Sequence, residues 1–430
     1  MNYEKIIIKW KEFQIPEVLK RLINLDLNHD FITTITGPRR AGKTYFCFQI
    51  IISLLEKGIS KENILYINFE DEKLLNANAN DLDNLFEKYL EFSEINNKQN
   101  IFLFLDEIQN VANWDSWIRR ISDTEKNIKL ILTGSSSKLL SKEISTKLRG
   151  RSLNTEVYPL SFEEHLKWKN IDYNLKTIIH SKDKIAVKKA FSLYLFEGGY
   201  PALSVNKKLP REQVLQGYYQ SMLFKDIVER YKIKEVKKLK ILIKLLFESV
   251  TKEISYNKLA NKLKSLGFKI SKNTIIEYIS HLEDAYLFFE NIKYEYSITK
   301  QLGSIKKIYC IDNGLLNATS FKFSDDRGKL MENLVFIELK RRKKEVYFYS
   351  DKNECDFLIK EKNKITSAIQ VSEKIEDNND KREINGLISA LEKYDLKEGM
   401  VLSLDDEKKQ EIIKKKKIKF IPIWKWLLER

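Results

Sequence analysis

Short apolar runs recur along the first 160 residues, and each run ends in a turn or in polar side chains. The runs have the length of buried β-strands, and segments of helical character separate them. This alternation is typical of an α/β fold built on a parallel sheet. We therefore expect strands at residues 30–35, 64–69, 101–105, 130–135 and 153–158.

Helical spacing replaces this pattern in residues 161–232. Phe162, His165, Leu166 and Trp168 fall on one helical face, and a long helix is expected from Arg211 to Tyr231. The glycines at 198 and 199 mark a turn. We interpret residues 161–232 as a small helical domain.

A third pattern begins near residue 233, where lysine-rich helices precede β-type segments. Gly267 would end one helix and Ser271 would cap the next. Two helices joined by a short turn and followed by strands are typical of a winged-helix module, which we assign to residues 233–312. The expected elements are helices at 239–250, 255–263 and 271–282 and strands at 287–292 and 305–311.

The most specific motif is G-x-x-x-x-G-K-T, which lies between the first strand and a helix. Glycines let the backbone wrap around a phosphate and aim N–H groups at it. Lys43 would reach the β/γ-phosphates of ATP, and the hydroxyl of Thr44 would bind Mg²⁺. The predicted nucleotide contacts are Gly37, Pro38, Arg39, Arg40, Ala41, Gly42, Lys43, Thr44 and Tyr45.

Two acidic residues follow the third apolar run, at the strand edge where α/β sheets bind ligands. Asp106 would hold the Mg²⁺ shell, and Glu107 would orient or deprotonate the attacking water. The fourth run ends in hydroxyls. Either Thr133 or Ser135 senses the γ-phosphate, or Ser135 caps the next helix.

Arginines near residue 150 are candidates for a cation that completes the site of a neighbouring subunit. An arginine supplied in this way raises the rate by about three to five orders of magnitude. Arg149 and Arg151 are therefore predicted catalytic residues, the alternative being ordinary surface arginines.

Several motifs in order resemble those of the archaeal-type AAA ATPases. The resemblance implies an AAA-type sheet with the phosphate strand central, a helical lid after residue 160 and a homo-oligomer. It covers about the first half of the chain and rests on the phosphate loop, Leu105–Gln109 with Trp114, Leu132–Ser136, Leu148–Arg151, Pro159–Phe162 and Gly198–Pro201.

Residues 320–430 resemble the PD-(D/E)XK nuclease-like domain that follows the ATPase in the same family, an α/β fold. The resemblance implies that Glu332, Asp356 and the position of Gln370 hold Mg²⁺, with a lysine at the position of Ser372. Because Gln370 replaces an acid and Ser372 replaces the lysine, we favour an inactive or binding-only domain over a nuclease. Lys374 is the alternative cation.

The charge balance favours a polyanionic partner. Lysine and arginine number 76 against 61 acidic residues, which gives a net charge of +15. Residues 231–300 contain 14 lysines and 8 acids, a net +6. DNA contact is expected there, although the module can instead pack against the ATPase or mediate assembly. The predicted groove-facing residues are Lys272, Asn273, Thr274 and Tyr278.

Composition removes other classes of protein. The three cysteines are scattered, so neither a disulfide framework nor a zinc site is expected. No apolar run is long enough to span a bilayer, so we expect a cytoplasmic protein without membrane contact.

Three functional hypotheses follow from these patterns. The first is an ATP-hydrolysing oligomeric switch or motor that is coupled to DNA. The second is a metal-dependent nuclease controlled by the ATPase, and the third is a scaffold in which ATP sets assembly and an acidic protein is the partner.

Overall fold

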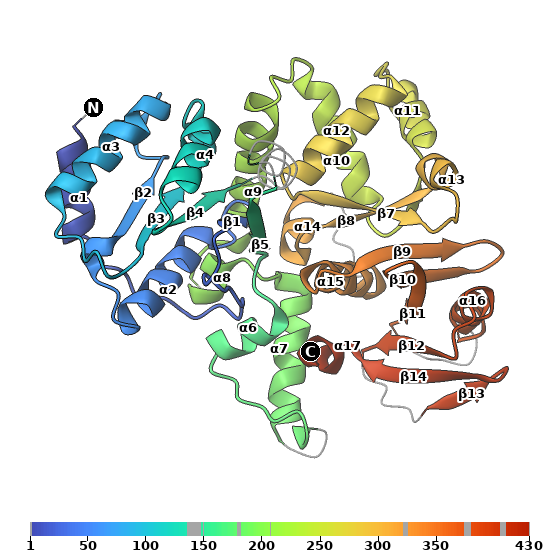
Figure 1. The fold of residues 1–430 in the computed structure, drawn as a ribbon. Helices are drawn as coiled ribbons and strands as arrows, with labels where there is room; N and C mark the ends of the chain where they lie inside the picture. The colour runs from blue at the N-terminus through green and yellow to red at the C-terminus, as the bar shows by residue number, and fades with distance from the viewer. Residues whose placement is uncertain are drawn as a thin grey trace. The chain divides into compact units, whose positions relative to one another are not determined.

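The chain forms two compact units in a computed structural model (Figure 1). The first unit contains Met1–Tyr158 and Asp284–Tyr286, and the second contains Pro159–Glu283 and Leu287–Arg430. The described residues are 2–135, 148, 150–178, 182–206, 208–320, 326–373, 380–404 and 410–429.

A five-stranded sheet in the order β2-β3-β4-β1-β5 forms the centre of the first unit. Each neighbouring pair is parallel, which confirms the predicted α/β class with a parallel sheet. Strand β1 lies between β4 and β5, so the strand that leads into the phosphate loop has an interior position. The strands are β1 (Ile32–Thr36), β2 (Ile64–Asn68), β3 (Ile101–Asp106), β4 (Ile128–Gly134) and β5 (Ser152–Glu156).

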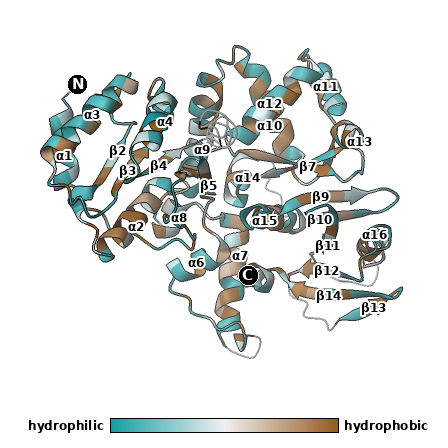
Figure 2. Ribbon diagram, viewed as in Figure 1, coloured by the Kyte–Doolittle hydropathy of each residue, from teal (hydrophilic) through white to brown (hydrophobic). Residues whose placement is uncertain are grey.

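The core of this unit follows from the apolar runs. Strands β1 and β3 are buried along their whole length. The helix after the loop is mostly hydrophobic, and it is largely brown in Figure 2. A helix that is apolar on most of its surface must be covered by its neighbours. The helices are α1 (Tyr3–Glu12), α2 (Lys43–Glu56), α3 (Ala79–Phe92) and α4 (Trp114–Thr124).

The second unit begins with helices, as predicted for residues 161–232. Ser161 and Glu164 form a capping box that starts the first of them. The helix predicted from Arg211 to Tyr231 changes its winding at Met222, where a π-helical segment, η5, runs to Glu229. The helices before it are α6 (Phe162–Trp168), α7 (Asp183–Glu197), α8 (Pro201–Val205) and α9 (Arg211–Ser221).

A nine-stranded sheet spans the rest of the second unit, in the order β13-β14-β12-β11-β10-β9-β7-β8-β6. The sequence predicts two separate modules here, whereas their strands share one sheet. The reason is that β7 pairs in parallel with β9, through Ile292 with Tyr347 and Lys293 with Phe348. The strands are β6 (Glu253–Ile254), β7 (Phe288–Lys293), β8 (Lys306–Cys310), β9 (Glu345–Ser350), β10 (Glu354–Glu361), β11 (Lys364–Val371), β12 (Glu398–Ser403), β13 (Glu411–Ile413) and β14 (Lys416–Pro422).

The segments before, between and after the strands of this sheet form helices. Those near residues 240, 260 and 277 lie where the sequence predicts helices. The helices are α10 (Val236–Glu248), α11 (Tyr256–Ser265), α12 (Lys272–Asp284), α13 (Ile298–Gly303), α14 (Asn313–Thr319), α15 (Arg327–Arg341), α16 (Asp380–Lys393) and α17 (Ile423–Leu428).

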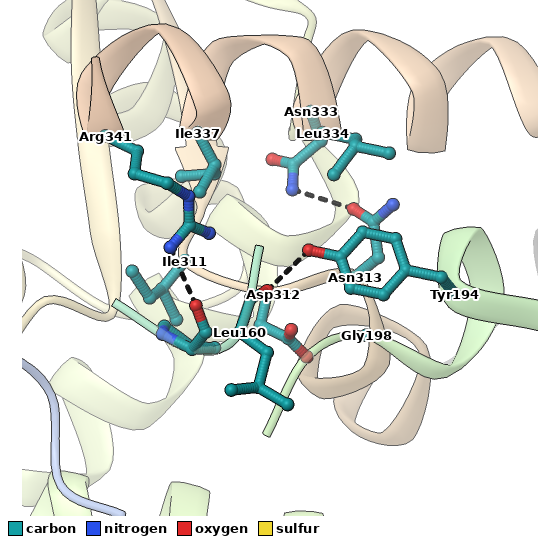
Figure 3. A pocket seen from close by; sticks show the side chains of 11 residues that line it. Leu160, Tyr194, Gly198, Ile311, Asp312, Asn313, Asn333, Leu334, Ile337 and Arg341 are labelled. Carbon is teal, nitrogen blue, oxygen red and sulfur yellow. Dashed lines mark hydrogen bonds between the residues drawn. The ribbon is translucent and has the colours of Figure 1, made fainter. Parts of the chain in front are cut away.

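The Gly198-Gly199 turn packs around the buried carboxylate of Asp312. The backbone N–H of Gly199 donates to Asp312 Oδ2 at 2.7 Å, and a Cβ on Gly198 would lie 2.1 Å from Asp312 Oδ1. Figure 3 shows the adjoining cavity, in which the Tyr194 hydroxyl reaches the carbonyl of Leu160. Its volume of about 20 Å³ holds roughly one water, so it is too small for a substrate.

Among the helices of the described residues, none combines the length and the apolar character that crossing a bilayer requires.

Candidate functional site: the loop between β1 and α2

The backbone of the loop needs glycine at both ends. Gly37 has φ +151°, and a Cβ there would lie 2.1 Å from the carbonyl oxygen of Val157. Gly42 has φ +95° and is the N-cap of α2, so no side chain caps the first turn of that helix. Arg40 also has a positive φ, +66°. The free N–H groups and the helix dipole make this end of α2 suited to an anion.

Lys43 lies buried beneath the loop, with 5% of its surface exposed. Its Nζ donates to the carbonyls of Gly37, at 3.1 Å, and Pro38, at 3.3 Å. The same nitrogen lies 3.6 Å from Glu107 Oε1. The Lys43 ammonium therefore lies at the loop, with two carbonyls and one carboxylate as neighbours, where its charge can bind a polyanionic ligand.

Asp106 accepts hydrogen bonds from three hydroxyls. Thr44 Oγ1 and the Tyr66 phenol donate to Oδ2, at 2.8 and 2.6 Å, and Thr133 Oγ1 donates to Oδ1. Burial raises the pKa of Asp106 and the neighbouring charge of Glu107 raises it further, whereas these hydrogen bonds lower it. The hydroxyl and carboxylate oxygens of Thr44 and Asp106 are hard ligands that fit Mg²⁺.

Glu107 directly follows β3 and has a left-handed backbone, with φ +55°. Its N–H donates to Thr133 Oγ1 at 3.0 Å, and Gln109 Nε2 donates to its Oε2. Non-glycine residues with positive φ concentrate at functional sites. Thr133, predicted as a phosphate sensor, contacts both acidic residues, because its hydroxyl accepts from the Glu107 N–H and donates to Asp106 Oδ1. Ser135, the other predicted sensor, is fully buried.

The remaining loop residues occupy different surroundings. Arg39 pairs with Glu70 at 2.7 Å, Ala41 is buried and Tyr45 is exposed. Of the two candidate arginine fingers, Arg151 is half-exposed and pairs with Asp123, whereas Arg149 lies outside the described residues.

Sequence reasoning missed three residues that hold this site. The buried guanidinium of Arg21 donates to the carbonyls of Ala41, at 2.9 Å, and Tyr158, at 2.8 Å, and so ties the loop to the end of β5. Tyr66 and Gln109 orient the two acids. Gln109 is close in sequence to Glu107 and was open to recognition, whereas Arg21 and Tyr66 belong to segments without a motif.

A second polar cluster lies in the nine-stranded sheet. Glu332, Asp356 and Gln370 come together there, as the nuclease resemblance implies, but Lys307 joins them. Burial would lower the pKa of Lys307, whereas Glu332 and Asp356 raise it well above its usual value. Ser372 is half-buried, and its backbone N–H donates to the carbonyl of Leu402 at 2.9 Å, whereas Lys374 lies outside the described residues.

Helix α12 carries the predicted DNA-contacting residues, and one of them is placed wrongly. Lys272 and Asn273 are exposed and Thr274 is half-buried. Tyr278, in contrast, is 7% exposed, because it falls with Ile275 and Ile279 on the apolar face of the helix. Its ring cannot face a groove in this conformation.

Comparison with known protein families identifies the class of the first unit. Residues 29–166 match the family described as "AAA domain". This match and the five-stranded parallel sheet define the first unit as an AAA-type P-loop domain. Residues 188–326 and 327–426 match two domains of unknown function, DUF8612 and DUF4143.

Relatives extend the likeness over the whole chain. The uncharacterized protein MJ1544 of Methanocaldococcus jannaschii is 38% identical over 99% of this chain and 95% of its own. An uncharacterized protein of Haemophilus influenzae is 33% identical over 81% of this chain and 84% of its own. The chain belongs to the family of AAA-domain proteins that includes these two relatives.

One solved structure that matches in part is the Walker-type ATPase PABY2304 of Pyrococcus abyssi. Its TM-score is 0.44 at 14% identity, and the match covers 74% of this chain and 94% of that one. The Aeropyrum pernix ORC1 protein in complex with DNA has a TM-score of 0.32 at 13% identity, with 69% and 87% coverage.

Proposed function

We propose that this protein binds ATP with Mg²⁺ at the loop between β1 and α2 and hydrolyses it. The observation that carries the proposal is the meeting of residues from two distant segments. Thr44 Oγ1 lies 2.8 Å from Asp106 Oδ2, and Lys43 Nζ lies 3.6 Å from Glu107 Oε1. A cation, a metal-binding pair and a candidate base are thus within one small volume.

Each residue has a distinct role in the proposed reaction. The loop N–H groups and Lys43 bind the phosphates, and Thr44 and Asp106 hold the metal. Mg²⁺, when bound, neutralises charge that develops on the phosphates. Glu107 orients the attacking water and accepts its proton, and Gln109 keeps that carboxylate in position.

The test compares two lysines at opposite ends of α2, Lys43 in its first turn and Lys57 at its C-cap. Lys43→Ala should lose ATP binding in a fluorescent-nucleotide titration, because the phosphates lose their buried cation. Lys57→Ala, at the exposed far end of the same helix, should bind like the wild type. Normal ATP hydrolysis by Lys43→Ala would refute the assignment of the site.

We also propose that nucleotide turnover is coupled to DNA through the winged-helix region. Two observations support this. Lys272 and Asn273 are exposed at the start of α12. At its other end the chain continues to Tyr286, which belongs to the first unit and donates to Thr36 Oγ1 at 2.9 Å. Thr36 precedes the phosphate loop directly, so the chain links the two features.

A titration with duplex DNA over a range of salt tests this coupling. Affinity should fall steeply with salt, and Lys272→Ala should reduce the slope of log K against log salt by about one. Lys264→Ala, an exposed lysine of α11, is the matched control. Absence of DNA binding at low salt would support the scaffold with an acidic protein partner instead.

We propose further that the protein works as a homo-oligomer in which Arg149 or Arg151 completes the site of the next subunit. Arg151→Ala should keep ATP binding and lose hydrolysis. Mixing it with Lys43→Ala should then restore activity, since each variant supplies what the other lacks.

The domains that we propose are residues 1–160 for the ATPase core, 161–232 for the helical lid, 233–312 for the winged helix and 320–430 for the nuclease-like domain.

A further inference from the structure

Strand β8 places a lysine inside the nine-stranded sheet. Every residue of β8 is buried, and the side chain of Lys307 is only 2% exposed. Lysine is almost never so deeply buried unless it is paired with an opposite charge. The surroundings of its ammonium therefore indicate what the lysine does.

Carboxylates from two other elements converge on Lys307 Nζ. Glu332 Oε1 of α15 lies at 2.9 Å and Asp356 Oδ1 of β10 at 3.0 Å, and Glu354 of β10 forms a third ion pair. Two of these acids, Glu332 and Asp356, are those that the nuclease resemblance implies as metal ligands. The ammonium thus lies where their oxygens meet.

The two acids also accept hydrogen bonds from other groups. The Tyr309 hydroxyl donates to Glu332 Oε1 at 2.7 Å. Gln370 Nε2 and the Val371 N–H donate to Asp356 Oδ2, at 2.8 and 3.0 Å. Gln370, which replaces an acid, therefore acts as a hydrogen-bond donor to Asp356. Across the described residues, no three His, Cys, Asp or Glu side chains are arranged to hold a metal ion.

We propose that the ammonium of Lys307 is the resident cation of this carboxylate cluster, so that the native protein neither binds a divalent metal there nor cleaves nucleic acid with it. One positive charge from the chain takes the place of a metal, and the neutral Gln370 leaves the cluster with less negative charge than an acid at that position would. The cluster also joins β8, α15 and β10. Its role is to stabilise the fold, and the proposal is independent of ATP hydrolysis.

The experiment is a Mn²⁺ titration of the full chain without nucleotide, followed by electron paramagnetic resonance. Wild-type protein and Asp356→Asn should bind the same amount of Mn²⁺, because the cluster of the wild type holds none. Lys307→Met, which has a similar length and no charge, should gain one Mn²⁺, and Lys307→Met with Asp356→Asn should lose it again. Plasmid incubated with wild-type protein and Mn²⁺ should stay intact.

Two results would overturn the proposal. One is a wild-type Mn²⁺ site that Asp356→Asn removes, and the other is a folded Lys307→Met variant that binds no Mn²⁺. A Lys307→Met variant that folds only with Mn²⁺ present supports it, because the metal then supplies the missing charge. If Lys307→Met folds neither with nor without Mn²⁺, the Mn²⁺ binding of wild type and of Asp356→Asn decides whether the proposal holds, since that comparison does not require Lys307→Met.

Discussion

The hydroxyl of Thr44 donates a hydrogen bond to Asp106 Oδ2 at 2.8 Å. The Tyr66 phenol donates to the same oxygen at 2.6 Å. The pair that we propose for Mg²⁺ is therefore already assembled, and a third residue from β2 holds the carboxylate. Tyr66 is a positioning residue, because it acts through Asp106.

Replacement of Tyr66 by phenylalanine should shift the acid limb of the pH profile. The phenol stabilises the charged form of Asp106, whose pKa is already raised by burial and by Glu107. Without it the carboxylate ionises at higher pH, so the acid limb of kcat/KM for Mg·ATP should move to higher pH. ATP binding in the presence of a chelator should not change.

Tyr89→Phe is the matched control for that measurement. Its hydroxyl is also hydrogen-bonded, but to the carbonyl of Glu62. The variant therefore reports the general effect of removing a tyrosine hydroxyl from this unit. Equal acid limbs in the two variants would contradict the positioning role of Tyr66.

Glu107→Gln should bind ATP and hydrolyse it about 10²–10⁴-fold more slowly, as expected when a general base is lost. Glutamine keeps the shape of the side chain but cannot accept the proton of the attacking water. Single-turnover hydrolysis measures the chemical step, and a nucleotide titration measures binding. Glu91→Gln, an exposed acid of α3 that pairs with Lys88, is the control. Wild-type turnover by Glu107→Gln would exclude this residue as the base.

Contiguous motifs made the parallel sheet and most of the site predictable. The glycines, Lys43 and Thr44 lie within eight residues, and Asp106 and Glu107 end an apolar run. The contacts of Arg21 and Tyr66 were not predictable, because folding brings both to the site from segments that carry no chemical motif, although Tyr66 lies in a predicted strand.

The second unit shows the same limit. The nuclease resemblance implies a lysine at the position of Ser372, whereas the lysine beside the acids is Lys307, from a strand 49 residues before Asp356 in the chain. Its one visible signal is a lysine within an apolar run, which requires a counter-charge. Tyr278 is wrongly predicted to face a groove because tyrosine occurs on buried and exposed faces alike, whereas the helical spacing puts it on the apolar face with Ile275 and Ile279.

Gly199→Ala should destabilise the second unit by about 2 kcal/mol or more, because the packing leaves no room for a side chain. Its Cβ would lie 2.4 Å from the carbonyl oxygen of Leu160. Gly217, within α9, has no atom within 4 Å of such a Cβ, so Gly217→Ala should stabilise by about 1 kcal/mol. Urea unfolding of both variants measures the difference. Equal stabilities would show that the turn can relax.

His165 should make the protein less stable in mild acid. Burial lowers its pKa to about 4, and the charges of Lys169 and Arg211 contribute. The folded state thus binds fewer protons than the unfolded chain, so stability is complete above the ordinary histidine pKa and falls as the pH decreases. Between pH 7 and pH 5 this group should cost about 2 kcal/mol of the free energy of unfolding.

Urea unfolding at the two pH values, with wild type and His165→Gln side by side, measures this contribution. The variant has no imidazole to protonate, so it should lose about 2 kcal/mol less than the wild type over that interval. His29→Gln, a half-buried histidine of the first unit, shows what the removal of another imidazole does. If wild type and His165→Gln lose the same free energy of unfolding between pH 7 and pH 5, the protonation of His165 does not contribute to the loss. The prediction would then be wrong.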